Sequence, residues 1–260
     1  MNTIETSPSP ARHSAPTKTF KSMRFFHAAA AALLLVLMLW GFNQFYMHGR
    51  AYPDRPLTPP IRTLLIMHGT AMAAWMLLSL AQPLLIVTNN RRTHMMLGRV
   101  GAVIAACIVI LGLRLGIEST RVNPPDMRLW GLSPKQFMAV PIISILIFGS
   151  FVTAGVLNRR RPEVHRAMML LSVLAVMPAA MDRIDAIKDL YSGTVWGTIF
   201  GPYFSMLVVA VIFLGVKWLL QRSVDKYYAI GCAGLIISSA LIMQIATTGA
   251  WDTFAGFLLR

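Results

Sequence analysis

Two short segments of the chain carry the residues best suited to chemistry. They read NNRRTHMMLG and NRRRPEVHRAMML, and each contains an arginine cluster, then a histidine, then two methionines. A neutral imidazole ligates haem iron, and two helices can present one histidine each to opposite faces of a porphyrin. His94 and His165 are therefore candidate axial ligands of a b-type haem. Arg99, five residues after His94, is a candidate partner for a haem propionate.

A structural role is the alternative for both histidines. Each follows an arginine cluster at the beginning of an apolar segment, where a histidine sits comfortably among lipid headgroups. The similarity of the two segments also suggests an internal repeat, although ten residues of similarity can arise by chance convergence on basic loop chemistry. The residues alone leave both alternatives open.

A second group of candidates lies toward the other ends of the apolar segments. His68 is seven residues inside its segment, and ionisable groups there usually face the bundle interior and mark a functional route. A histidine satisfied by a backbone carbonyl is the structural alternative. Desolvated charges must pair, so we predict a contact between Arg114 and either Asp182 or Asp185. The two aspartates are three residues apart and, on one helix, would share a face, which also fits a proton or cation relay.

The composition identifies the solvent that surrounds these residues. The chain has 260 residues, of which 56% are apolar and 13% charged, against roughly 45–50% and 25% in soluble domains. The apolar residues form blocks longer than the ~20 residues that cross a bilayer. The net charge of +14 fits basic loops beside lipid headgroups, so nucleic acid is not an expected partner. The sequence predicts a multi-pass membrane protein.

The blocks predict an all-α bundle of seven membrane-spanning helices. They cover residues 25–47, 61–87, 97–117, 137–157, 167–187, 198–220 and 227–246. Residues 1–22 are predicted to be a disordered basic cytoplasmic tail, because this polar segment buries too little surface to offset its ordering entropy. The transmembrane domain would occupy residues 23–247, and residues 248–260 would form a short outer C-terminal segment.

The basic residues predict the orientation. Fourteen of the 24 Lys and Arg residues lie in the N-terminal tail and at the second, fourth and sixth connections, and seven of the ten acids lie on the other side. The two sides carry net charges of +11 and +3, which places the N-terminus in the cytoplasm and the C-terminus outside. The expected location is a bacterial inner membrane.

Several other residues have structural interpretations. Gln82 and Gln244 are predicted to bridge helices. Trp130 is predicted to anchor an interfacial segment in the proline-rich connection before the fourth span. Cys107 and Cys232 show no metal-ligand spacing. The sequence contains no nucleotide-binding or peptidase signature.

One segment resembles a known family. Residues 68–101, HGTAMAAWMLLSLAQPLLIVTNNRRTHMMLGRVG, resemble the ascorbate-dependent transmembrane cytochrome b and ferric reductase family, and also uncharacterised bacterial multi-pass families with an H…W…Q…R…H..LG pattern. The resemblance extends over residues 61–187. It implies four histidines on consecutive helices that hold two b haems. His68, His94 and His165 match the first, second and fourth ligands, but residues 137–157 contain no histidine. The resemblance thus implies one haem between His94 and His165 and leaves His68 without its partner.

Three hypotheses for function follow. The first is a b-type haem-binding or quinone-linked electron-transfer protein. The second is a non-enzymatic accessory or assembly subunit of a membrane respiratory complex, with no cofactor. The third is a small-solute or proton transporter that uses His68 and the charge cluster of Arg114, Asp182 and Asp185. Expected partners are the lipid bilayer and, under the first two hypotheses, a quinone or respiratory subunits. Whether the protein is an enzyme is left open.

Overall fold

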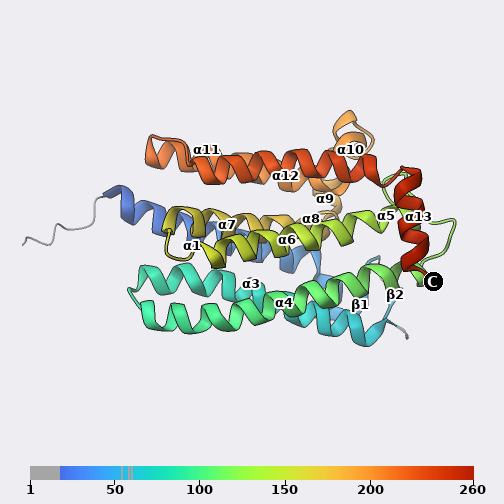
Figure 1. The fold of residues 1–260 in the computed structure, drawn as a ribbon, viewed down its shortest axis with the longest axis horizontal. Helices are drawn as coiled ribbons and strands as arrows, with labels where there is room; N and C mark the ends of the chain where they lie inside the picture. The colour runs from blue at the N-terminus through green and yellow to red at the C-terminus, as the bar shows by residue number, and fades with distance from the viewer. Residues whose placement is uncertain (1–17, 54, 58, 60) are drawn as a thin grey trace, which may run out of the picture.

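The computed structural model describes residues 18–53, 55–57, 59 and 61–260. Its long helices run roughly along one direction and form an elongated bundle (Figure 1). These helices are α1 (Lys18–Gly41), α3 (Arg62–Val87), α4 (Arg91–Val122), α6 (Ala139–Leu157), α7 (Pro162–Val176), α11 (Phe204–Gln221) and α12 (Lys226–Ile245).

Short elements gather mainly toward one end of the bundle (Figure 1). They are α2 (Asn43–His48), β1 (Arg50–Ala51), β2 (Arg55–Pro56), α5 (Pro134–Phe137), α8 (Pro178–Met181), α9 (Asp185–Lys188), α10 (Val195–Phe200), the 3-10 helix η1 (Gly201–Tyr203) and α13 (Gly249–Leu258). The strands β1 and β2 pair antiparallel. We call the end with α5, α9 and α13 the capped end. The opposite end holds the turns at residues 88–90, 158–161 and 222–225, and we call it the arginine end.

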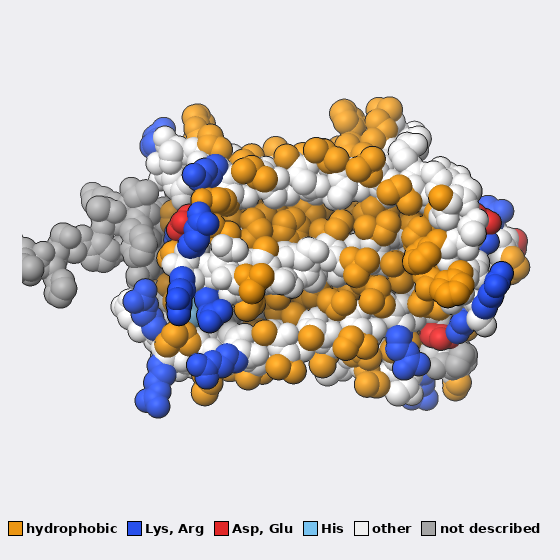
Figure 2. Space-filling model, in the orientation of Figure 1, with side chains coloured by type: hydrophobic (Ala, Val, Ile, Leu, Met, Phe, Trp, Pro, Cys, Tyr) orange, Lys and Arg blue, Asp and Glu red, His pale blue; other side chains and the backbone are white. Residues whose placement is uncertain are grey.

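The chain is suited to cross a membrane several times. Six helical segments are long and apolar enough to span a bilayer: Arg62–Val87, Arg91–Val122, Pro134–Leu157, Pro162–Met181, Val195–Gln221 and Lys226–Ile245. The helix α1 adds a shorter apolar stretch, Phe25–Gly41. In Figure 2, hydrophobic side chains cover the middle of the visible face, and charged side chains gather at its two ends. The seventh span and the cytoplasmic N-terminus remain predictions.

The long helices follow the predicted spans closely, with one correction at the fifth. That span was expected to continue through residue 187, but α7 ends at Val176 and the short helix α8 ends at Met181. Pro178 has no N–H for the helical ladder, and Ile184 has extended dihedral angles before Asp185 begins α9. Asp182 and Asp185 therefore do not share one helix face, and the prediction that they do is wrong.

The two chain ends also differ from expectation in part. Most of the predicted tail, residues 1–17, lies outside the described residues, and from Lys18 the chain is helical. The predicted outer segment 248–260 contains the helix α13, which lies across the bundle end (Figure 1). Trp251 of α13 donates its indole N–H to the Lys135 carbonyl at 3.1 Å, and Asp252 pairs with Lys135 at 2.7 Å. These two contacts fasten α13 to α5.

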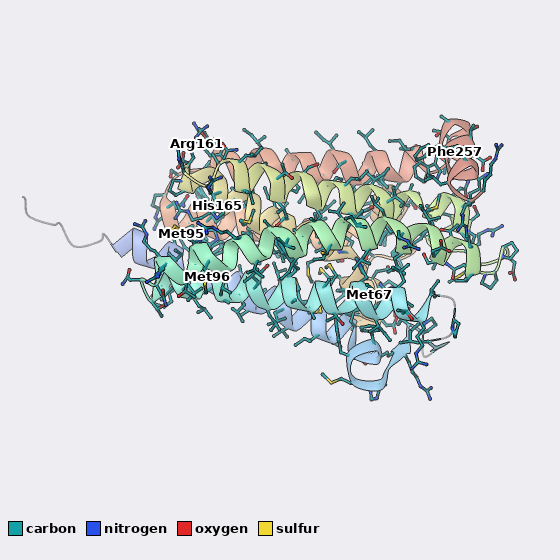
Figure 3. The ribbon with its side chains drawn as sticks, turned by 60° about the horizontal axis from the view of Figure 1, so that its bottom comes forward. Met67, Met95, Met96, Arg161, His165 and Phe257 are labelled. Carbon is teal, nitrogen blue, oxygen red and sulfur yellow. The ribbon has the colours of Figure 1, made fainter. Side chains whose placement is uncertain are left out.

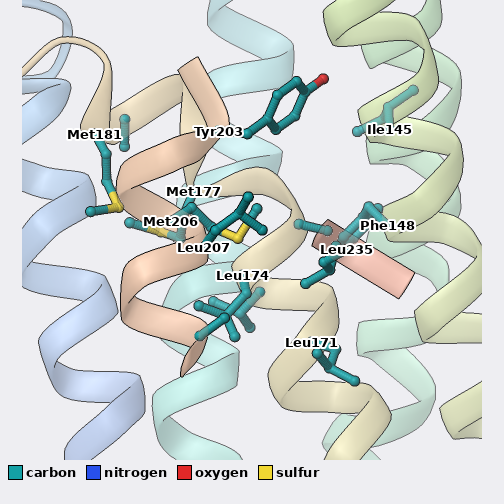
Figure 4. Close-up of a cluster of buried hydrophobic side chains, with 14 of the residues drawn as sticks. Ile145, Phe148, Leu171, Leu174, Met177, Met181, Tyr203, Met206, Leu207 and Leu235 are labelled. Carbon is teal, nitrogen blue, oxygen red and sulfur yellow. The ribbon is translucent and has the colours of Figure 1, made fainter. Parts of the chain in front are cut away.

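The hydrophobic core is centred on α7. In the most apolar part of its span, 67% of the residues are buried, against 11% in the span of α3. Figure 4 shows a cluster of side chains in this core. They include Ile145 and Phe148 of α6, Leu171 and Leu174 of α7, Met206 and Leu207 of α11, and Leu235 of α12. The helix α3 lies at the periphery, and its hairpin with α4 packs on the core through α6 and α1.

Candidate functional site

The structure brings His94 and His165 together at the arginine end. Their ring centroids are 6.3 Å apart, and the ring planes make an angle of 80°. The two residues come from different helical hairpins, α3–α4 and α6–α7. Figure 3 labels His165 near Met95 and Met96 at this end, with Met67 and Phe257 toward the other. The two histidines singled out in the sequence therefore lie side by side.

The helix beginnings place both histidines equivalently. The Asn90 side chain caps α4 by accepting a hydrogen bond from the Thr93 N–H at 3.2 Å, a common way to begin a helix. Pro162 is the first residue of α7, a position where its missing N–H costs nothing. Each histidine is consequently the fourth residue of its helix and lies one turn from the connecting loop.

Backbone carbonyls of the preceding helices hold the two rings. His165 Nδ1 lies 2.9 Å from the Gly155 carbonyl oxygen, and His94 Nδ1 lies 3.3 Å from the Gln82 carbonyl oxygen. A carbonyl oxygen only accepts hydrogen bonds, so an Nδ1 that donates to it carries the proton, and the neutral ring then keeps a lone pair on Nε2. Metal-binding histidines commonly have this carbonyl partner, because it fixes the tautomer and the ring orientation.

The Gln82 side chain also contacts His94. With its amide oxygen accepting from the Gly98 N–H at 3.0 Å, its amide nitrogen lies 2.5 Å from His94 Nδ1. Gln82 thus bridges α3 and α4, as predicted. One ring nitrogen cannot donate to the carbonyl and accept from the amide at once, so Gln82 influences the tautomer of His94. Only the carbonyl-bonded tautomer leaves Nε2 free as a ligand.

The spacing of the rings fits a single iron between them. Two imidazoles that bind one metal through nitrogens at about 2 Å have centroids roughly 6 Å apart, and the observed separation is 6.3 Å. Arg91, Arg92 and Arg99 on the first turns of α4 are exposed and can offset the charge of propionate groups. The donor types and the ring separation therefore fit two histidine ligands on one iron, although no contact of Arg99 with either ring is found among the described residues.

His68 lies elsewhere. It is near the beginning of α3, about 28 Å along the helix axis from the turn that leads to His94, at 1.5 Å per residue. Its Nδ1 is buried and has no hydrogen-bond partner among the described residues. A Cβ added to Gly112 would lie 3.1 Å from His68 Cε1 and 2.8 Å from Ile145 Cγ1. His68 is thus enclosed by α3, α4 and α6 toward the capped end.

The predicted contact of Arg114 with Asp182 or Asp185 is wrong. Asp182 accepts a hydrogen bond from the Trp130 indole N–H at 2.8 Å, and Asp185 pairs with Lys188 at 2.6 Å. Arg114 is exposed on α4, and in the described part of the chain no ion pair joins it to either aspartate. The aspartates instead take partners from other segments at the capped end.

Trp130 has a role that the sequence did not reveal. Its ring stacks on Tyr191 with centroids 5.4 Å apart and an interplanar angle of 11°, and the anchoring of this loop at the lipid interface stays a prediction. Burial raises the pKa of Asp182, while the hydrogen bond from Trp130 and the charge of Arg183 oppose this rise. The aromatic donor and the carboxylate come from segments 52 residues apart, which explains why no local pattern revealed the contact.

A buried ion pair at the arginine end was also missed. Lys217 was counted among the edge cations, but its side chain is only 1% exposed and its Nζ lies 2.9 Å from Asp225 Oδ2. The Lys217 ammonium also lies 5.5 Å from the Phe26 ring centroid and 5.3 Å from that of Tyr228. The pair joins α11 to the beginning of α12. Its only sequence signal is the placement of Asp225 as a helix cap, where it accepts from the Tyr228 N–H.

Comparison of this chain with protein-family models, with curated proteins and with solved structures finds no match. A helical bundle by itself does not define a function. The function must therefore be argued from the site.

Proposed function

We propose that this integral membrane protein binds one b-type haem at its arginine end, with His94 and His165 as axial ligands, and serves in electron transfer. The observation that carries the proposal is the histidine pair. Two residues from separate hairpins meet at a centroid distance of 6.3 Å, and each has its Nδ1 next to a backbone carbonyl.

The protein residues have distinct tasks in this proposal. The Gly155 and Gln82 carbonyls orient the rings and increase the basicity of Nε2. Arg99 and the neighbouring Arg91 and Arg92 supply positive charge for propionates at the bilayer edge. A bound haem would supply one-electron redox chemistry, at a potential set by the axial ligands and the local polarity.

The proposal is limited to one haem. His68 is at the other end of α3, and α6 contains no histidine. A chain of two haems across the membrane needs a second pair of ligands, and His68 has no second histidine opposite it among the described residues. The proposal therefore differs from the two-haem arrangement of the cytochrome family that the sequence resembles.

An absorption spectrum of the purified full-length protein tests the proposal. We expect a Soret band with about one haem per chain, and its loss in His94→Ala and in His165→Ala. His48→Ala is the matched control, because His48 is exposed on α2 and should leave the band unchanged. Absence of a Soret band after expression with added haem precursor, or an unchanged band in His94→Ala, would overturn the proposal.

The cofactor-free accessory subunit remains the second candidate, and one observation favours it. The Gly155 carbonyl lies in the last turn of α6, where carbonyls lack helical partners, so His165 caps this helix without any cofactor. Under this hypothesis His165→Ala lowers stability by about 1 kcal/mol, the value of one hydrogen bond, and the wild-type protein shows no Soret band. Co-purification with respiratory subunits would then support it.

A further inference from the structure

A cavity lies at the capped end, far from the histidine pair. This half-open cavity of about 270 Å³ is lined by three parts of the chain: the end of α1 with the beginning of α2, Tyr52, and the segment from α8 to α9. Its lining residues include Trp40, Asn43, Tyr52, Arg183 and Asp185. Polar side chains from distant segments thus converge on one space.

The cavity lies at the level expected for lipid headgroups. The apolar stretch of α1, Phe25–Gly41, ends in the cavity wall. Trp40 is 53% exposed and Val36, one turn earlier, is 58% exposed. Tryptophan is enriched where a membrane-spanning segment meets the headgroup region. A ligand with an apolar tail could place that tail along this face of α1 and its polar group in the cavity.

The cation in the wall is held in place. The Arg183 guanidinium lies 4.8 Å from the Phe42 ring centroid and donates to the Ala179 carbonyl. A guanidinium has five N–H donors in a planar fork, so it can hold several partners at once, a ligand among them. The fork matches the geometry of phosphate oxygens better than a lysine ammonium does.

The carboxylate in the wall accepts from two donors, and no hydrogen bond to its second oxygen is found among the residues that the structure describes. Tyr52 donates its hydroxyl to Asp185 Oδ1 at 2.8 Å, and Lys188 donates to the same oxygen at 2.6 Å. Both bonds end on Oδ1, so Oδ2 keeps its capacity to accept. Arg183 and Lys188 stand beside the carboxylates of Asp182 and Asp185, so an anionic group would be held by the Arg183 fork itself and not by a net positive charge.

We infer that this cavity binds the headgroup of a phospholipid whose phosphodiester faces Arg183 and whose terminal hydrogen-bond donor faces Asp185. The donor is the ammonium of phosphoethanolamine or a hydroxyl of phosphoglycerol. Choline fits the cavity less well, because its quaternary ammonium cannot donate a hydrogen bond. A soluble phosphodiester has the same chemistry, but the position beside the lipid-facing end of α1 favours a lipid.

Native mass spectrometry of the protein tests this inference. The protein is released from micelles that contain equal amounts of phosphatidylethanolamine, phosphatidylglycerol and phosphatidylcholine. We expect the first two lipids to remain bound about tenfold more than the third, the effect of one charge-assisted hydrogen bond. Arg183→Gln should reduce retention of all three lipids. Asp185→Asn should remove most of the preference for phosphatidylethanolamine but keep phosphatidylglycerol, since an amide oxygen still accepts from a hydroxyl.

Controls separate binding from folding. Asp189→Asn and Arg128→Gln change exposed charges outside the cavity wall and should leave lipid retention unchanged. Ala186→Leu fills the cavity without changing its charge and should reduce retention of both preferred lipids. Glycerophosphoethanolamine serves as the tail-free probe, and displacement of lipid by it at millimolar concentration would identify a soluble ligand instead. Equal retention of the three lipids in the wild-type protein, retention that Arg183→Gln and Ala186→Leu leave unchanged, or a preference for phosphatidylethanolamine that survives Asp185→Asn, would overturn the inference.

Discussion

The two ends of the bundle are built differently. At the arginine end, short turns join long helices, and the exposed arginines greatly outnumber nearby acids among the described residues, Glu163 and Asp225. At the capped end, short elements cover the helices, and charges pair across short distances, as in Arg121 with Glu118 at 2.9 Å and Lys135 with Asp252 at 2.7 Å. The arginine end leaves charge available for a ligand or for lipid headgroups, whereas the capped end uses much of its charge to hold the fold.

The ion pair of Lys217 with Asp225 is the exception at the arginine end, because it holds the fold together, and its loss gives the largest predicted effect. Lys217→Ala leaves the half-buried Asp225 without its partner and empties the buried space of the lysine, and we expect a loss of about 3 kcal/mol in the free energy of unfolding. The measurement is denaturant unfolding in detergent micelles.

The double variant Lys217→Met with Asp225→Asn is the control. It removes both charges, and an asparagine side chain can still cap α12 in place of the aspartate, so this variant should recover most of the loss. A loss in Lys217→Ala below about 0.5 kcal/mol, the range of ordinary surface substitutions, would show that the pair does not hold this end together.

Trp130→Phe tests the hydrogen bond between Trp130 and Asp182 at the capped end. The variant keeps an aromatic ring to stack on Tyr191 but removes the N–H that Asp182 accepts. We expect a loss of about 1–3 kcal/mol, the cost of leaving a buried acceptor unsatisfied. Thermal unfolding of the purified protein measures this. An unchanged melting temperature would mean that water replaces the indole at no cost.

The pH dependence of stability should distinguish the two aspartates near this contact. Burial raises the pKa of Asp182, so its folded state binds a proton more tightly, and its contribution to stability declines as pH rises from the ordinary value of about 3.9 through the folded pKa. Hydrogen bonds from Lys188 and Tyr52 lower the pKa of Asp185. Its contribution is present above the ordinary value and is lost as pH falls.

Melting curves between pH 3 and 8 measure these two contributions. Asp182→Asn should make the protein relatively more stable at the upper end of this range, and Asp185→Asn relatively less stable there. Equal changes in both variants would contradict the assignment of opposite shifts.

Arg114→Gln should have the smallest effect. Arg114 is exposed on α4 and pairs with neither Asp182 nor Asp185, so we expect a change within about 0.5 kcal/mol. Unfolding of the single variant and of Arg114→Gln with Asp182→Asn measures the coupling between the sites. Coupling above about 1 kcal/mol would show that Arg114 and Asp182 interact, as the sequence suggested.

The predictions succeeded where local rules decide the geometry. The helix boundaries follow the apolar blocks, and the position of His94 and His165 one turn into their helices depends on the neighbouring residues Asn90 and Pro162. The two histidines occupy equivalent positions after turns that lie at the same end of the bundle. This placement was enough to bring their rings together. The sequence therefore contained most of the fold and the central pair of the site.

The predictions failed where distant segments decide the geometry. The helix break at residues 182–184 gives Asp182 and Asp185 different surroundings, and the partner of Asp182 comes from a loop 52 residues away. Lys217 looked like an edge cation because only tertiary packing against Phe26 and Tyr228 buries it. The cavity at the capped end requires three segments at once, and no single motif encodes it.

Electron paramagnetic resonance of the oxidised, purified protein tests the central claim most directly. With His94 and His165 as axial ligands and ring planes near the observed 80°, we predict a low-spin ferric signal of the highly anisotropic type that nearly perpendicular imidazoles produce. His94→Ala or His165→Ala should convert it to a high-spin signal or abolish haem binding, and His48→Ala should not. A wild-type protein with added haem that gives only a high-spin signal, or that retains no haem, would contradict the account.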